Sequence, residues 1–206
     1  MKRLVIFLML IIMVMILGCQ SPLLNDPSDP PTQEQGQEDP DVSQAPDENQ
    51  SSPKFSVESL GRVRLGMSAE EVESILGNDY TQEIHDEGGY FGESIIVRTY
   101  ADGCDLIIGS NSDRVLQMEA YSESYPTSMG FRVGDPSMQV MDAYRGKYRE
   151  FVGRHSSEKL LGWFMIGDTC ELLIFSSQEN RERFNENIAA DSKVTGITLG
   201  YSYYFD

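Results

Sequence analysis

Side chains suited to acid–base or metal chemistry are scarce in this chain. Its 206 residues include only two histidines, His85 and His155. Neither histidine belongs to a His-Glu-x-x-His pair, and no Cys-x-x-Cys motif accompanies them, so a metal site would have to be assembled from scattered carboxylates. We therefore expect solvated loop histidines and predict no metal and no cofactor.

Motifs for covalent catalysis and phosphate binding are missing from the sequence as well. There is no Gly-x-Ser-x-Gly elbow, no Gly-rich phosphate loop followed by lysine and no Rossmann fingerprint, and Cys170 with His155 lacks the local signature of a cysteine enzyme. The sequence predicts no catalytic residue and a noncatalytic protein. One alternative stays open: an envelope hydrolase or metal-dependent enzyme that uses His85 or His155 with nearby acids.

Two cysteines, Cys104 and Cys170, begin similar strand-like sequences. Outside the cytoplasm they could form a disulfide, provided that their Cα atoms come within about 7 Å. The alternative is that both are small buried apolar side chains. The sequence does not choose between the two.

Aromatic residues offer another kind of chemistry, which is the burial of large rigid side chains at a protein interface. Trp163, Tyr121, Tyr201 and Tyr203 lie in expected strands or beside loops, where alternation turns some side chains outward. Core packing is the alternative for each of them. We predict that Trp163 and Tyr121, with Tyr201 and Tyr203 beside them, bind a protein on an exposed sheet face.

A repeated pattern supplies the elements that would position these residues. Residues 63–77 align with residues 131–146 at an offset of 68 (131 − 63), and each segment has the pattern of a short strand, a glycine turn and an amphipathic helix. The expected caps are Ser68 with Glu71 and Gly77 in the first helix, and Asp135, Pro136 and Gly146 in the second. The expected buried residues are Val72, Ile75 and Leu76, then Val140, Ala143 and Tyr144.

Alternating apolar sequence, cut by turn signals, follows each helix. Residues 104–108 align with residues 170–174 at an offset of 66 (170 − 104). The sequence predicts an α+β fold of two tandem repeats, residues 55–126 and 127–206, each a short helix packed on an antiparallel sheet. Strands are expected near residues 94–100, 104–109, 114–121, 161–166, 170–175 and 193–204, with a loop at 178–187.

The first repeat carries a family resemblance. The run Arg64-Leu65-Gly66-Met67-Ser68, followed by a short helix and strands with an Asp-Gly turn, resembles the repeat of β-lactamase inhibitor proteins and of small outer-membrane assembly lipoproteins. This resemblance implies noncatalytic binding of proteins through the sheet face and its loops. Tandem inhibitors carry a disulfide within each repeat, whereas this chain has one cysteine per repeat. The resemblance also leaves open a structural assembly factor of an envelope complex.

The N-terminus has the layout of a lipoprotein signal peptide. Lys2 and Arg3 precede an apolar run, residues 4–17, that as a helix would span about 21 Å, too short for a hydrocarbon core of roughly 30 Å. Ile16-Leu17-Gly18-Cys19 resembles a lipobox. We predict that residues 1–18 are removed and that diacylglycerol and a fatty acid such as palmitate on Cys19 hold the protein on the cell membrane, facing outside the cytoplasm.

Between the anchor and the folded part, residues 19–54 are expected to form a disordered acidic tether rich in proline and glutamine. Without Lys2 and Arg3 the chain has 14 basic residues (16 − 2) against 33 acids, a formal charge of −19. This charge disfavours binding to nucleic acid or to bare anionic lipid, and it favours solubility or a cationic partner. The predicted partner is an envelope or secreted protein.

Overall fold

An eight-stranded antiparallel sheet forms the centre of the structure, a computed structural model that describes residues 56–153, 157–178 and 180–205. Two α-helices and two short 3-10 helices accompany it, so the fold is mixed α+β with the sheet dominant. The elements are α1 (Ala69–Leu76), β1 (Tyr80–His85), η1 (Gly89–Phe91), β2 (Ile95–Tyr100), β3 (Cys104–Gly109), β4 (Val115–Ala120), α2 (Ser137–Arg145), β5 (Arg149–Val152), β6 (Lys159–Met165), β7 (Glu171–Ser176), β8 (Gly196–Tyr201) and η2 (Ser202–Tyr204).

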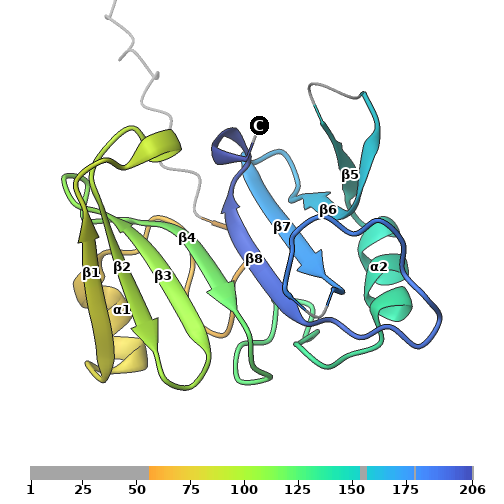
Figure 1. Ribbon diagram of the computed structural model, residues 1–206, viewed down its shortest axis with the longest axis horizontal. Coiled ribbons are helices and arrows are strands. Elements are labelled where there is room, and N and C mark those ends of the chain that lie inside the picture. The colour runs from red at the N-terminus through yellow and green to blue at the C-terminus, as the bar shows by residue number, and fades with distance from the viewer. Residues whose placement is uncertain (1–55, 154–156, 179, 206) are drawn as a thin grey trace, which may run out of the picture. The chain divides into compact units, whose positions relative to one another are not determined.

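The strands follow the spatial order β1-β2-β3-β4-β8-β7-β6-β5 (Figure 1). Strands β1 to β4 pair with their sequence neighbours, as do β5 to β8. The two groups meet only where β4 pairs with β8, in a register that runs from Gln117 opposite Gly200 to Ala120 opposite Ile197. All neighbouring strands are antiparallel, as predicted.

The six predicted strands are present, with ends that differ by a few residues, and two more were not anticipated. The edge strands β1 and β5 were not predicted, because β1 is mostly polar, with five of its six residues exposed, and β5 is only four residues long. The last predicted strand, 193–204, is shorter than expected, since β8 ends at Tyr201 and η2 follows.

Helix α1 begins as predicted. The Ser68 side chain accepts a hydrogen bond from the Glu71 N–H at 3.2 Å, and the Glu71 carboxylate accepts one from the Ser68 N–H at 2.7 Å. Gly77 ends the helix with a positive φ of 81°, but its ψ of −169° differs from the predicted left-handed helical conformation. Its φ still favours glycine at this position.

Helix α2 begins one residue later than predicted. Pro136, not Asp135, is the N-cap residue, and no side chain caps the helix. The Asp135 carboxylate instead accepts a hydrogen bond from the Arg132 N–H at 2.9 Å and so stabilises the preceding turn. Gly146 follows the helix with an ordinary negative φ.

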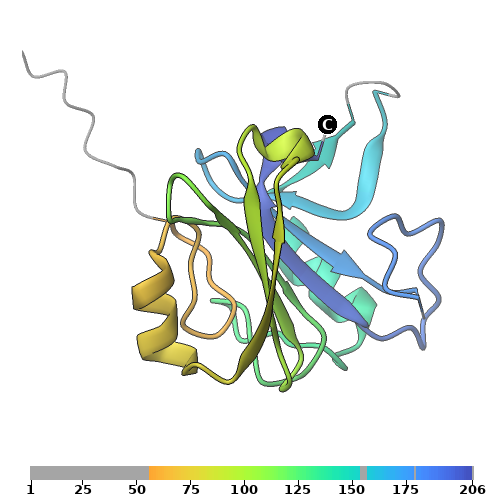
Figure 2. The same ribbon diagram turned by 60° about the vertical axis from the view of Figure 1, so that its left-hand side comes forward.

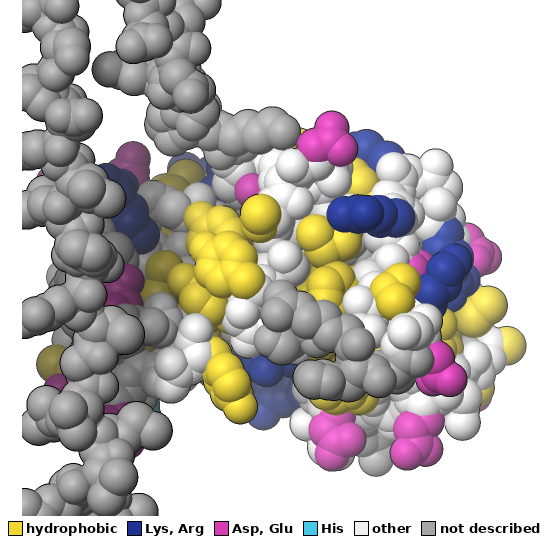
Figure 3. Space-filling view, turned by 90° about the horizontal axis from the view of Figure 1, so that it is seen from above, with side chains coloured by type: hydrophobic (Ala, Val, Ile, Leu, Met, Phe, Trp, Pro, Cys, Tyr) yellow, Lys and Arg dark blue, Asp and Glu magenta, His cyan; other side chains and the backbone are white. Residues whose placement is uncertain are grey.

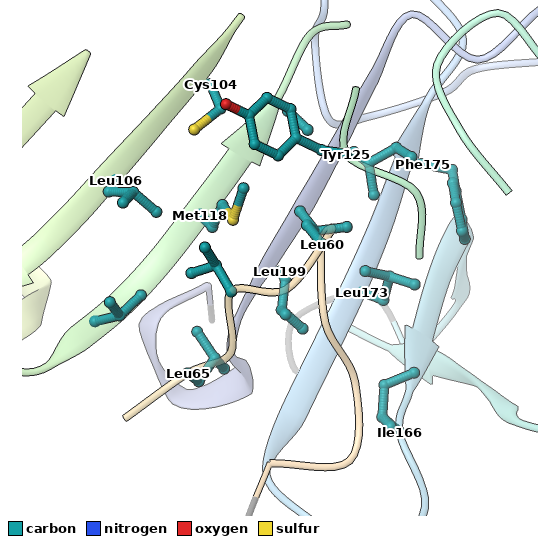
Figure 4. Close-up of a cluster of buried hydrophobic side chains, with 14 of the residues drawn as sticks. Leu60, Leu65, Cys104, Leu106, Met118, Tyr125, Ile166, Leu173, Phe175 and Leu199 are labelled. Carbon is teal, nitrogen blue, oxygen red and sulfur yellow. The ribbon is translucent and has the colours of Figure 1, made fainter. Parts of the chain in front are cut away.

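Both helices bury side chains in one core cluster on the same face of the sheet. Val72 from α1 and Tyr144 from α2 are fully buried there, together with the predicted Val140, whereas Ile75 and Leu76 are partly buried. Figure 4 shows side chains of both groups of strands meeting Leu60 and Leu65 of the N-terminal segment. In Figure 2, α1 lies beside the strands of the first group.

The other face of the sheet is called here the second face. It was expected to be free, but part of it is covered. All six residues of β7 are buried, because a smaller cluster covers this side of the second group of strands. Its buried members are Trp163, Leu172 and Ile174, and Phe151, Leu160, Met165 and Phe205 pack around them.

A buried carboxylate ties the N-terminal segment to the core. Glu58 is 0% exposed; its Oε1 accepts hydrogen bonds from the N–H groups of Ser59 and Ser128, and Tyr144 donates its hydroxyl to Oε2. The Glu171 carboxylate in turn accepts from the Glu58 N–H at 3.2 Å. Since buried polar groups are tolerated only when hydrogen-bonded, these contacts fix the path of the segment.

Removing the α1 cap should lower stability. We expect Ser68→Ala to reduce the free energy of unfolding by about 1 kcal/mol, because the Glu71 N–H loses its acceptor. Urea denaturation of the purified chain measures this. Ser68→Thr keeps a hydroxyl and is the matched control; an equal loss in both variants would contradict the capping role.

Glu171 should make stability depend on pH. Burial raises the pKa of its carboxyl above the ordinary 4.5 and outweighs the backbone hydrogen bonds from Glu58 and Val57. The contribution of the protonated Glu171 carboxyl to the free energy of unfolding is complete below pH 4.5. It is lost as the pH rises through the raised pKa of the folded chain.

Glu171→Gln mimics the protonated form, so we expect this variant to gain stability relative to the natural chain as the pH rises from 4.5. Denaturation midpoints across this pH range, with the exposed Glu70→Gln as control, provide the measurement. If the difference in denaturation midpoint between Glu171→Gln and the natural chain does not change with pH, the ionisation of Glu171 is not linked to stability.

Candidate functional site

Aromatic side chains gather at one end of the sheet, where η1 and η2 lie. The group comprises Tyr90 and Phe91 from η1, and Tyr201, Tyr203 and Tyr204 from the end of β8 and η2. We call these five residues the aromatic rim. Seen from this end of the molecule, hydrophobic side chains form a group on the surface (Figure 3).

Ring contacts join the two halves of the rim. The Phe91 and Tyr204 ring centroids lie 4.7 Å apart, and Tyr204 lies 4.5 Å from Tyr203 in an edge-on arrangement. Tyr203 in turn stacks on Tyr201 at 5.4 Å with 8° between the ring planes. Tyr90 is 88% exposed and Tyr203 is 51% exposed. Tyr203 thus presents ring surface that its neighbours Tyr201 and Tyr204 hold in place.

Polar contacts position η1. The Glu93 carboxylate accepts hydrogen bonds from the Asn111 N–H at 2.7 Å and the Ser112 N–H at 2.9 Å, which ties η1 to the β3–β4 turn. The Ser112 side chain, followed by these backbone N–H groups, holds the pKa of Glu93 below its usual value. Gly92 ends η1 with φ 74°, a left-handed conformation that favours glycine.

The chain after β8 positions η2. The Ser202 N–H donates to the Cys170 carbonyl at 2.7 Å. Phe205 then turns back over β8, and a Cβ added to Gly200 would lie only 2.7 Å from the Phe205 ring. The same ring meets Trp163 edge-on at 5.9 Å. A side chain at position 200 would therefore have to displace the Phe205 ring.

Burial disfavours ionisation of two rim tyrosines, Tyr201 and Tyr203. It raises the pKa of Tyr201 and of Tyr203, and the hydrogen bond between Tyr203 and Tyr204 raises the pKa of Tyr203 further. At neutral pH these hydroxyl groups remain protonated and can donate hydrogen bonds. The rim therefore combines apolar ring surface with neutral polar groups, which is typical of protein interfaces.

Trp163, a predicted contact residue, lies in the core instead. It is 1% exposed, its Nε1–H donates to the Arg183 carbonyl at 2.8 Å, and the Phe184 ring lies 5.0 Å away. The loop that follows β7 therefore covers it on the second face. Its role is packing, the alternative that the sequence left open.

Tyr121 lies in a polar network on the second face. Its hydroxyl is 2.7 Å from Asp105 Oδ2 and 2.9 Å from Glu119 Oε2, and the Arg181 guanidinium lies 4.1 Å from its ring centroid. Arg183 pairs with Glu119. Burial, followed by the Glu119 charge, raises the pKa of Tyr121. The ring is half-buried and already occupied by these partners.

Of the predicted contact residues, the structure brings only Tyr201 and Tyr203 together. The other rim residues were not predicted as contacts, although one sequence signal could have found two of them. Tyr90 and Phe91 stand between glycines, outside any strand or helix pattern, and aromatic residues in such a turn are prone to be exposed.

The two cysteines do not form the disulfide that their matching positions suggested. Cys104 is buried, Cys170 is exposed, and both are free. Cys104 on β3 lies opposite Ala120 on β4, which lies opposite Ile197 on β8, which lies opposite Phe175 on β7. Cys104 is therefore three strand spacings, about 14 Å, from β7, the strand that Cys170 precedes. This exceeds the limit of about 7 Å. Burial raises the pKa of the Cys104 thiol to about 12 and makes it unreactive.

The remaining candidates show no assembled chemistry. His85 ends the exposed edge strand β1, with Nε2 3.7 Å from the Glu83 carboxylate. His155 and Cys19 lie outside the described residues. Within the described ranges, no group of three or more His, Cys, Asp or Glu side chains could hold a metal ion. The described part of the chain also contains no helix long and apolar enough to cross a membrane.

Uncovering Trp163 should change its fluorescence. It is the only tryptophan, so its emission reports the loop contact directly. We expect Phe184→Ala to shift the emission to longer wavelength, because water gains access to the indole, and to lower the free energy of unfolding by about 1 kcal/mol. Tyr90→Ala, at a ring that does not touch Trp163, is the control. Unchanged emission in Phe184→Ala would disprove the covering role.

Comparison with known proteins found no relative. No family model matches the sequence, and searches of the curated proteins and of the solved structures gave no significant match.

Proposed function

We propose that this chain is a noncatalytic, lipid-anchored protein of the cell envelope that binds a partner protein through the aromatic rim. Confinement by a lipid on Cys19 and by the tether of residues 19–54 would raise its effective concentration near envelope partners. We also propose that residues 55–126 and 127–206 are tandem repeats. In support, each half runs from one α-helix into four antiparallel strands, in the same order.

The exposed rings of the rim carry the binding proposal. Tyr90 and Tyr203 are large side chains that expose 88% and 51% of their surface, and Tyr201 and Tyr204 hold Tyr203 in place from two sides. Rings that are already ordered lose little conformational entropy on binding, which is why tyrosine is enriched at interfaces.

The rim is a better contact surface than the centre of the second face. Phe184 and Phe205 cover Trp163, and Arg181 covers Tyr121, so a partner would have to displace these contacts to reach either residue. A partner that docks on the rim meets no such obstacle. The partner surface should carry basic residues, because the chain without residues 1–18 has a formal charge of −19 (14 − 33).

Photo-crosslinking in intact cells tests the proposal. A crosslinkable residue placed at Tyr90 or at Tyr203 in the full lipidated chain should capture one discrete protein. The same residue at Glu70, exposed on α1, is the positional control. Absence of a product at both rim positions, or the same product at Glu70, would reject the rim as the binding surface.

Alanine variants give the energetic test. Tyr90→Ala and Tyr203→Ala should each weaken binding of the captured protein tenfold or more, by about 1.4 kcal/mol or more, as truncation of an interface anchor does. Met138→Ala removes a comparably exposed apolar side chain from α2 and should change the affinity little.

The captured complex also separates two functions. Recovery of the partner as a constant stoichiometric complex would identify an assembly factor. Reversible binding would identify a recognition module.

A further inference from the structure

A basic cavity lies beside the end of α2, apart from the aromatic rim. Its volume is about 290 Å³, and its lining residues are Arg145, Tyr148, Arg149, Glu150 and Lys159. They come from the end of α2, the turn after it, β5 and the first residue of β6. Figure 3 shows Lys and Arg side chains on the side of the molecule where β5 and β6 lie.

One glutamate organises two of the three cations. Glu150 Oε1 is 2.9 Å from Arg145 Nε, and Glu150 Oε2 is 3.6 Å from Lys159 Nζ. Only 13% of the Glu150 side chain is exposed, so the carboxylate holds both cations from the inner side of the cavity. Arg145 also pairs with Asp142 at 3.1 Å, on the α2 surface.

Arg149 is left without an acidic partner. It is exposed, and it forms no ion pair with any residue that the structure describes. Three cations against the carboxylates of Glu150 and Asp142 leave a charge of +1 (3 − 2) at the cavity, within a chain whose formal charge is −17. The carbonyl end of α2 offsets roughly half a unit of this charge. The cavity therefore stays positive.

We propose that this cavity binds a phosphate group. The planar guanidinium fork of Arg149 matches the oxygens of a phosphate, Lys159 adds a point charge, and the Tyr148 hydroxyl can donate to a further oxygen. Arg145, whose Nε and Nη1 are held by Glu150 and Asp142, contributes its charge beside them. The cavity lies just below the range of about 300–1,000 Å³ that drug-sized ligands occupy, so the ligand is a phosphate with a small substituent. A soluble phosphate ester and a phospholipid headgroup both present this chemistry.

Calorimetric titration of the chain with inorganic phosphate and with glycerol 3-phosphate is the first arm of the test. The protein is produced from residue 19 with Cys19→Ser, which removes the apolar segment 1–18 and the predicted lipid attachment, so that the same protein serves in the vesicle arm. We expect saturable binding with a Kd of about 1 mM or tighter, weakened about tenfold by Arg149→Gln. Lys193→Gln removes an exposed positive charge outside the cavity and should leave the Kd within about twofold.

Cosedimentation with vesicles is the second arm and identifies the source of the phosphate. Binding to vesicles of phosphatidylcholine with phosphatidic acid, lost in Arg149→Gln and not in Lys193→Gln, would support a headgroup ligand. Saturable binding of the soluble phosphates alone would support a soluble ester. Absence of binding in both arms, or equal weakening by the two variants, would overturn the proposal, because the cavity would then contribute no specific site.

Discussion

The pairing of β4 with β8 is the constraint on which the rest of the structure depends. Each group of four strands needs only its own hairpins, but the continuous sheet exists because residues 117–120 pair with residues 197–200. This junction places α1 and α2 over one core cluster. Both helices therefore bury their apolar side chains against the same continuous sheet. It also brings η2, at the end of β8, to the end of the sheet where η1 lies, and so lets Phe91 meet Tyr204.

Polar groups inside the fold set its details. Glu58, fully buried, connects the N-terminal segment to Ser128 and Tyr144, while Glu171 accepts from the backbone of the same segment. Arg98 fixes α1 on the sheet in a similar way, with NH1 2.9 Å from the Glu73 carboxylate and its guanidinium 4.4 Å from the Tyr80 ring centroid. Such contacts make one arrangement of the apolar surfaces preferable to others of similar burial.

The two proposed sites use different physical chemistry. The rim offers ring surface and neutral hydroxyl groups for a protein, whereas the cavity offers positive charge for a phosphate. They draw on different strands and share no residue. A chain held at a membrane could then contact a protein and a phosphate-bearing ligand with separate parts of the same sheet.

The amino-acid sequence by itself determined the local elements. Capping-box spacing located α1, alternation located six strands, and turn residues such as Gly103 separated them, because these signals act between residues a few positions apart. The edge strands lacked such a signal, since solvent contact on both faces removes the alternation. Only the tertiary structure decided that Trp163 is buried, that Cys104 lies far from Cys170, and that Tyr90 joins Tyr203 at one surface. The physical reason is that these outcomes depend on sheet order and on which loop covers which face, and both are set by pairing between strands distant in the chain.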